Sequence, residues 1–191
     1  MTSRHRGKTF VSAALCLALA GGTSAAAPVP DLTVRPAASQ HPPDDQLVES
    51  VVRAVTTYPR FTIFDDINVQ AEGGVVTLTG RVTMPVKKDE LARRVSAVDG
   101  VKSVRNDIDI LPASTGDDEL RQRLARAIYG HAAFWRYAAM PRPPIHIVIE
   151  HGRVTLTGTV FSEADRVLAR SLASGHGELS VTNALRTEGP K

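Results

Sequence analysis

Histidines and paired aspartates are the residues of this chain whose types could carry chemistry. Zinc sites combine histidines or cysteines at set spacings, and neither the spacing of the six histidines nor a neighbouring cysteine matches such a pattern. The acidic pairs Asp44-Asp45 and Asp117-Asp118 each stand at the beginning of a segment with helical periodicity, where carboxylates complement the helix dipole. We therefore predict no metal site, and we interpret the acidic pairs as helix starts.

The common catalytic and nucleotide-binding motifs are missing from the sequence. It contains no G-x-S-x-G nucleophile turn, no P-loop and no dinucleotide-binding glycine motif. We predict no catalytic residue and no cofactor, and we expect a protein that is not an enzyme.

The first 26 residues have the pattern of a secretory signal peptide. Basic residues precede an apolar run from Phe10 to Ala20, and the small residues TSAAA follow. We expect cleavage near Ala26, export to the periplasm and a disordered leader over residues 27–43. Because the apolar run is too short to span a bilayer, we expect no transmembrane helix in the mature protein.

Export changes the charge and the redox chemistry. Removing Arg4, Arg6 and Lys8 from the 23 basic residues leaves 20, which equals the 20 acidic residues. A neutral mature protein gives no electrostatic reason to expect nucleic acid as a partner. Cys16, the only cysteine, leaves with the signal, and Leu15 stands where a lipoprotein signal would have a small residue.

A five-residue match, VTLTG, occurs twice and belongs to a longer internal repeat. Three stretches of the first copy align with three of the second: 44–55 with 117–128, 67–82 with 145–160, and 91–110 with 168–187. The second copy has a longer loop that contains WRYAAMPRPP. We predict domains at 44–112 and 117–187, a linker at 113–116 and a tail at 188–191.

The same order of hydrophobic patterns recurs in both copies. Helical spacing predicts a first helix, and alternation of apolar and polar residues then predicts two strands joined by Gly73-Gly74 or His151-Gly152. A second amphipathic helix and a third strand complete the copy. The predicted fold class is α+β, with two αββαβ domains, each a small three-stranded sheet with two helices on one face.

Some matched residues have structural explanations. Gly80 and Gly158 fall at an inward strand position, where a missing side chain lets a helix or neighbouring strand approach closely. Asn106 and Asn183 occupy equivalent places, and we expect their side chains to bond a turn or a strand end. Ser162 with Asp165 resembles a capping box.

The ordered pattern resembles the BON domain. GGVVTLTGRV with VKSVRN carries the resemblance in the first copy, and HGRVTLTGTV with LSVTN carries it in the second. The resemblance implies a periplasmic, non-enzymatic module that binds phospholipid or supports envelope integrity and stress tolerance.

The two copies differ most in charge and in the loop. Domain one has nine basic and eleven acidic residues and domain two has nine and seven, which gives formal charges of −2 and +2. Tryptophan and tyrosine favour membrane interfaces, and arginine is attracted to anionic lipid. We hypothesise that domain two contacts anionic phospholipid through its loop and first helix, by Trp135, Arg136, Tyr137, Met140, Arg142, Arg121, Arg123 and Arg126.

Two alternatives stay open from the sequence. Trp135 and Tyr137 could instead fold back and cover the hydrophobic edge of their own domain. Exposed sheet edges and opposite domain charges could support self-association, or docking to a protein of the envelope.

Overall fold

The computed structural model describes residues 44–188, which belong to one compact unit. The predicted signal peptide and leader lie outside the described residues. No helix within residues 44–188 is both long and apolar enough to cross a membrane.

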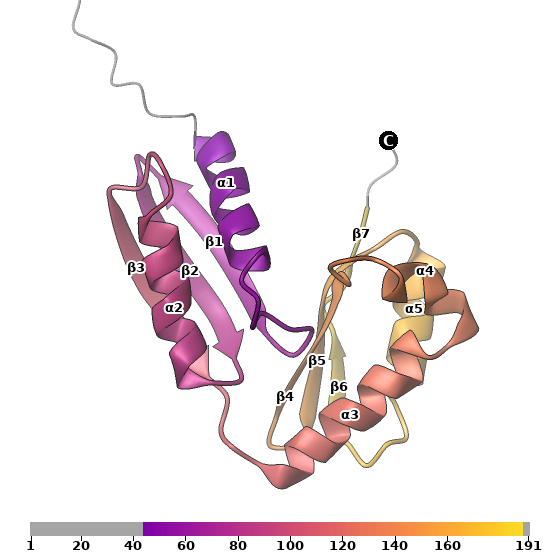
Figure 1. Cartoon of the computed structure of the whole chain (residues 1–191). Coiled ribbons are helices and arrows are strands. Elements are labelled where there is room, and N and C mark those ends of the chain that lie inside the picture. The colour runs from indigo at the N-terminus through magenta and orange to yellow at the C-terminus, as the bar shows by residue number, and fades with distance from the viewer. Residues whose placement is uncertain (1–43, 189–191) are drawn as a thin grey trace, which may run out of the picture. The chain divides into compact units, whose positions relative to one another are not determined.

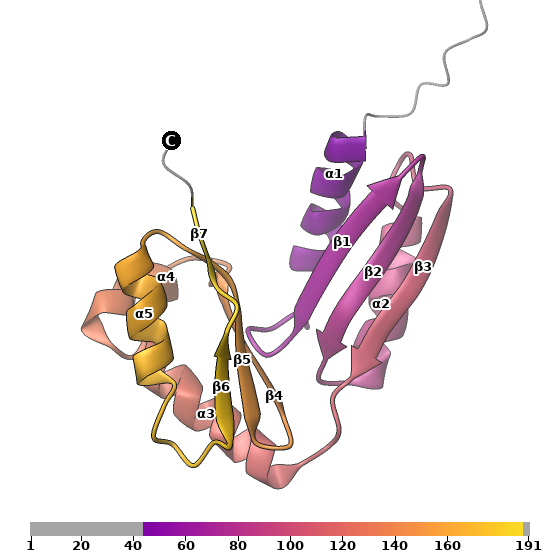
Figure 2. The same cartoon turned by 180° about the vertical axis from the view of Figure 1, so that it is seen from behind.

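The first copy has the predicted order of elements, α1 (Asp44–Thr56), β1 (Asp66–Glu72), β2 (Val75–Val82), α2 (Pro85–Ser96) and β3 (Ser103–Ile110). The central strand β2 pairs antiparallel with β1 and parallel with β3. Both helices cover one face of this sheet, as the two opposite views show (Figures 1 and 2). The αββαβ prediction is confirmed for this copy.

The second copy repeats this order with additions: α3 (Thr115–Tyr129), η1 (Ala132–Phe134), α4 (Trp135–Ala138), β4 (Ile145–Glu150), β5 (Arg153–Val160), α5 (Glu163–Leu172), β6 (Ser180–Asn183) and β7 (Arg186–Thr187). The predicted third strand over 180–187 is divided into β6 and β7, and both pair parallel with β5. The additional loop forms the short helices η1 and α4.

Each copy has its own hydrophobic core between helices and sheet. The apolar stripe of α1, made by Leu47, Val51 and Val55, is buried, as are alternate residues of β2. The stripe of α3, with Leu124 and Ile128, is buried in the same way. In each copy, the apolar side chains that recur every 3.6 residues along the helices therefore pack against those that recur every two residues along the strands.

Gly80 and Gly158 let the neighbouring strand approach. Their φ angles are +123° and +104°, a region that residues with a side chain rarely adopt. A Cβ atom would lie 2.1 Å from the carbonyl oxygen of Asp66 at Gly80, and 1.8 Å from that of Pro144 at Gly158. Close approach is confirmed. The group that approaches each glycine is a backbone carbonyl at the start of the first strand of the copy, or just before that strand.

The matched asparagines tie the third strand to a helix. Asn106 Nδ2 donates to the Lys88 carbonyl at 3.0 Å, and Asn183 Nδ2 donates to the Arg166 carbonyl at 2.8 Å. The partner is thus a helical carbonyl in the first turns of α2 and α5. Each Oδ1 also accepts the amide two residues on, from Ile108 within β3 at 3.4 Å and from Leu185 just beyond the end of β6 at 3.3 Å, so the expected strand-end bond is present in the second copy.

Asp117 lies in the first turn of α3, as the predicted helix start requires, and it has a further role. Helix α3 is capped by Ser114, whose Oγ accepts from the Asp117 amide, so the end of the predicted linker belongs to the helix. The Asp117 carboxylate accepts the amides of His151 and Gly152, both at 2.8 Å, and holds the hairpin turn. Asp44 accepts the Gly73 amide at 3.3 Å in the first copy.

Candidate functional site

The loop that distinguishes domain two follows α3 and leads into β4. His131 caps η1 by accepting the Ala133 amide on Nδ1 at 3.2 Å, and Phe134 enters the core. Helix α4 follows directly, and prolines at 141, 143 and 144 carry the chain to β4. Because proline fixes φ and donates no backbone hydrogen bond, this last stretch is stiff and poor in donors.

Tyr137 lies at the centre of the folded loop and is fully buried. Its hydroxyl donates to Asp165 Oδ2 at 2.8 Å and accepts the Phe161 amide at 2.8 Å. Its ring stacks on Phe161 with centroids 5.0 Å apart, and burial raises the pKa of its hydroxyl. Tyr137 is thus part of the core, where a membrane cannot reach it.

Arg136 forms a half-exposed ion pair with Asp165. Its guanidinium lies 4.6 Å from the ring centroid of Phe161 and 5.1 Å from that of Tyr137, within cation–π range. Burial alone would raise the pKa of Asp165, but the Tyr137 hydrogen bond and the Arg136 charge outweigh it and hold this pKa below its ordinary value. Ser162 caps α5 as expected, whereas the Asp165 carboxylate bonds the loop and does not complete a capping box.

Trp135 is exposed and Tyr137 is buried, although they are only two positions apart. Two steps along a helix turn a side chain by about 200°. Tyr137 therefore points into the core, whereas Trp135 is 70% exposed, the second most exposed large hydrophobic residue of the described chain after Leu179. The fold-back alternative holds for Tyr137 alone.

The arginines proposed to contact lipid also differ in whether they are buried or exposed. Arg121 is buried and donates to the Ile149 carbonyl at 2.7 Å, so it lies away from the surface that the hypothesis requires. Arg123 is paired with Glu119 at 3.6 Å. Arg126 and Arg142 are exposed and form no ion pair within residues 44–188. Met140 is partly buried against the core.

An apolar groove runs beside these exposed residues. We call it the α3–α4 groove; its open volume is about 640 Å³, and it is lined by Ile63, Ala125, Arg126, Tyr129, Gly130, Ala138 and Pro143. The Tyr129 hydroxyl donates to the Ile145 carbonyl, so this polar group is satisfied inside the chain. Arg126 is the only charged residue among those that line the groove.

An ion pair joins the loop before the first strand to the following helix in both copies, with opposite polarity; it is buried in domain one and half-exposed in domain two. In domain one, Lys87 of α2 donates to Asp65 at 2.6 Å, and both side chains are buried. In domain two the helix supplies the acid, Asp165, and the loop supplies Arg136. The matched asparagines bond the Lys88 and Arg166 carbonyls, which makes the preceding residues, Lys87 and Asp165, equivalent in the two helices.

The acceptor roles in these pairs also differ. The Thr83 amide donates to Asp65 Oδ1 at 2.9 Å, whereas the equivalent Phe161 amide donates to the Tyr137 hydroxyl. Tyrosine therefore accepts in domain two the bond that a carboxylate accepts in domain one.

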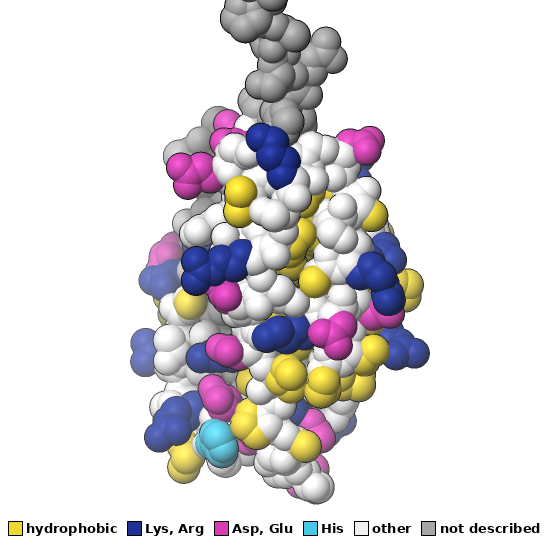
Figure 3. Space-filling model, turned by 90° about the vertical axis from the view of Figure 1, so that its left-hand side faces the viewer, with side chains coloured by type: hydrophobic (Ala, Val, Ile, Leu, Met, Phe, Trp, Pro, Cys, Tyr) yellow, Lys and Arg dark blue, Asp and Glu magenta, His cyan; other side chains and the backbone are white. Residues whose placement is uncertain are grey.

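Charges of both signs cover the side of the molecule shown in Figure 3. Basic and acidic side chains are interspersed on this face, and neither sign occupies a broad region of it. In the described part of the chain, no three His, Cys, Asp or Glu side chains gather as a metal site would require.

The comparisons with known proteins agree with the duplicated fold. The model of the BON domain family matches residues 43–112 and 116–189. Osmotically-inducible protein Y of Escherichia coli (strain K12) is 28% identical over 147 residues, which covers 76% of this chain and 73% of that protein.

Solved structures of CdsD, a structural protein of the type III secretion system of Chlamydia trachomatis, also match. For its C-terminal domain, identity is 15%, the TM-score is 0.28, and the match covers 77% of this chain and all of the other. A second CdsD structure gives 17% identity and a TM-score of 0.27, with coverage of 75% and 94%. These scores are too low to indicate a shared overall structure.

Proposed function

The chain belongs to the BON domain family, and from this premise we propose an exported, non-enzymatic protein of the bacterial envelope that contacts anionic phospholipid through domain two. The name of its osmotically inducible relative supports a role in osmotic stress. The predicted signal peptide supports export to the periplasm.

The exposure of Trp135 is the observation that carries the lipid proposal. This side chain stands on the short helix that also supplies Ala138 to the α3–α4 groove, and Arg126 borders the same groove. An exposed tryptophan in the same domain as the exposed arginines Arg126 and Arg142 combines an interfacial anchor with attraction to anionic headgroups.

The expected free energy of membrane binding is that of a weak, reversible contact. Two arginines near an anionic surface contribute about 2 kcal/mol. Burying the exposed part of the indole, at ~25 cal/mol per Å² over roughly 140 Å², adds about 3.5 kcal/mol at most. A total of about 5.5 kcal/mol corresponds to a dissociation constant of about 0.1 mM, so one molecule binds weakly and several together bind well.

Vesicle co-sedimentation of the mature protein, residues 27–191, tests the proposal. We expect binding to phosphatidylglycerol-containing vesicles, little binding to pure phosphatidylcholine, and a loss of about a hundredfold for Trp135→Ala. Leu179→Ala is the matched control, because Leu179 is 74% exposed in the same domain and lies away from α4 in sequence. Equal binding to both vesicle types, or by Trp135→Ala and the wild type, would refute the proposal.

Arg126→Glu supplies an independent electrostatic arm. The side chain is exposed and forms no ion pair within residues 44–188, so the substitution is expected to preserve the fold and to weaken binding to anionic vesicles at least tenfold. Arg136→Glu is a poorer choice, because it would break the pair with Asp165.

A further inference from the structure

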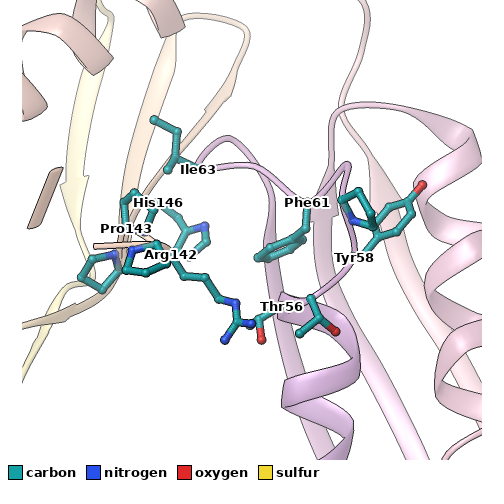
Figure 4. A pocket seen from close by; sticks show the side chains of 11 residues that line it. Thr56, Tyr58, Phe61, Ile63, Arg142, Pro143 and His146 are labelled. Atoms are coloured by element: carbon teal, nitrogen blue, oxygen red, sulfur yellow. The ribbon is translucent and has the colours of Figure 1, made fainter. Parts of the chain in front are cut away.

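A second cavity lies on the other side of the proline-rich segment. We call it the proline pocket; its open volume is about 570 Å³. One wall is the chain that leaves α1, with Thr56, Tyr58, Phe61 and Ile63, and the other is the segment Pro141–Pro144 with His146 of β4 (Figure 4). Its volume falls within the ~300–1,000 Å³ typical of small-molecule sites.

The two walls are held together by direct contacts. The Ile147 amide donates to the Ile63 carbonyl at 2.7 Å, so the loop before β1 continues the hydrogen bonding of β4. The rings of Phe61 and His146 also contact each other, with their centroids 5.5 Å apart. Residues of both copies thus form the cavity. The wall from the second copy includes part of the loop that the first copy lacks.

The charge of the proline pocket is of one sign. Arg142 and His146 are the ionisable bases among its lining residues, and no aspartate or glutamate lines it. Arg142 extends across the cavity toward Thr56 in Figure 4, and it forms no ion pair within residues 44–188. A guanidinium without a partner, over a pocket without acids, favours an anion.

The threonine hydroxyls of the wall are already used, whereas Nδ1 of His146 is buried without a hydrogen-bond partner among the described residues. Thr56 and Thr57 donate their hydroxyl protons to the carbonyls of Val52 and Arg53, at 2.9 and 2.7 Å. Tyr58 turns its hydroxyl away from the cavity (Figure 4). A ligand therefore meets the guanidinium of Arg142, the ring of His146 with its unpartnered Nδ1, and an apolar wall of Phe61, Ile63 and prolines.

We propose that the proline pocket binds a small amphiphilic anion, with an apolar ring or chain against Phe61 and the prolines and a carboxylate or phosphate on Arg142. This site differs from the Trp135 surface in its residues and in its ligand, which enters a cavity and does not lie on a membrane. It gives the additional loop of domain two a second use, because Pro141–Pro144 build one of its walls.

Amide-detected NMR titration of the mature protein with 2-naphthoate tests the site, and 2-naphthamide serves as the uncharged control. We expect naphthoate to perturb amides around Phe61, Arg142 and His146, and naphthamide to bind at least tenfold more weakly. Arg142→Ala should weaken naphthoate at least tenfold, since hydrogen bonds to charged groups are the strong ones. Arg126 is exposed and lies outside the proline pocket, so Arg126→Ala should leave the affinity for naphthoate unchanged.

Three outcomes would overturn the proposal. They are equal binding of naphthoate and naphthamide, no effect of Arg142→Ala in a protein whose circular dichroism is unchanged, and perturbations that lie away from the pocket. Titration with dihexanoyl phosphatidylglycerol below its micelle concentration separates the sources of the ligand, because a headgroup bound here would shift the same amides. Trp135→Ala should abolish vesicle binding and keep naphthoate binding, so the two proposals fail separately.

Discussion

Lys87→Met should destabilise domain one by about 3–5 kcal/mol, because it leaves Asp65 charged and buried without its cation. The carboxylate keeps four donors, the amides and hydroxyls of Thr62 and Thr83, at 2.8 to 3.0 Å. These bonds hold the charge in place but do not neutralise it. A loss of this size is a large part of the ~5–15 kcal/mol that stabilises a typical domain.

Urea unfolding of the mature protein followed by far-UV circular dichroism measures the change, and hydrogen exchange read by mass spectrometry assigns it to one copy. We expect faster exchange in peptides of β1 to β3 and little change in those of domain two. Arg53→Met is the matched control, since it removes the same charge from the exposed pair with Glu49 and should cost less than about 1 kcal/mol.

The exchanged double variant Asp65→Lys with Lys87→Asp provides the stricter test. Two backbone amides point at the position of the carboxylate, so an ammonium placed there would face two N–H donors and leave both without their acceptor. We expect no rescue of stability. A loss below about 1 kcal/mol for Lys87→Met, or full rescue by the exchanged pair, would refute the reasoning.

Three further predictions concern the second copy. Gly158→Ala should cost several kcal/mol in the free energy of unfolding, because its Cβ would lie 1.8 Å from the Pro144 carbonyl oxygen; a fully stable variant would contradict this. Tyr137→Phe should cost about 1–3 kcal/mol by leaving the Phe161 amide without an acceptor, and thermal unfolding measures this. Because the pKa of Asp165 is lower in the folded state than its ordinary value, its contribution is complete above about pH 4 and is lost as the pH falls through the folded pKa. Asp165→Asn should therefore flatten the acid limb of the stability profile, and an unchanged limb would count against the pair.

The duplication and its elements could be predicted from the sequence because they depend on local periodicity and on matched segments. Gly80 is an example, since an inward glycine on a strand indicates close approach whatever the partner. Asp117 shows the limit of this reasoning. Its place near a helix start suggested a cap, but its carboxylate bonds a turn more than 30 residues away.

The loop of domain two could be identified from the sequence as the difference between the copies, but its arrangement could not. WRYAAMPRPP has too little periodicity to show that two of its residues would form opposite sides of one short helix. The direction of Tyr137 is decided by a hydrogen bond to Asp165 and a stack on Phe161, both on elements far along the chain. The exposure of Trp135 follows from that anchoring.

Because the two loop–helix ion pairs have reversed polarity, the loop of one copy does not suit the helix of the other. A hybrid with the loop of the first copy and the helix of the second would set Asp65 against Asp165, and the reciprocal hybrid would set Arg136 against Lys87. Tandem repeats risk such cross-pairing while they fold, and like charges in a buried site oppose it. The sign of the charge on each helix, basic at Lys87 and acidic at Asp165, therefore distinguishes one copy from the other.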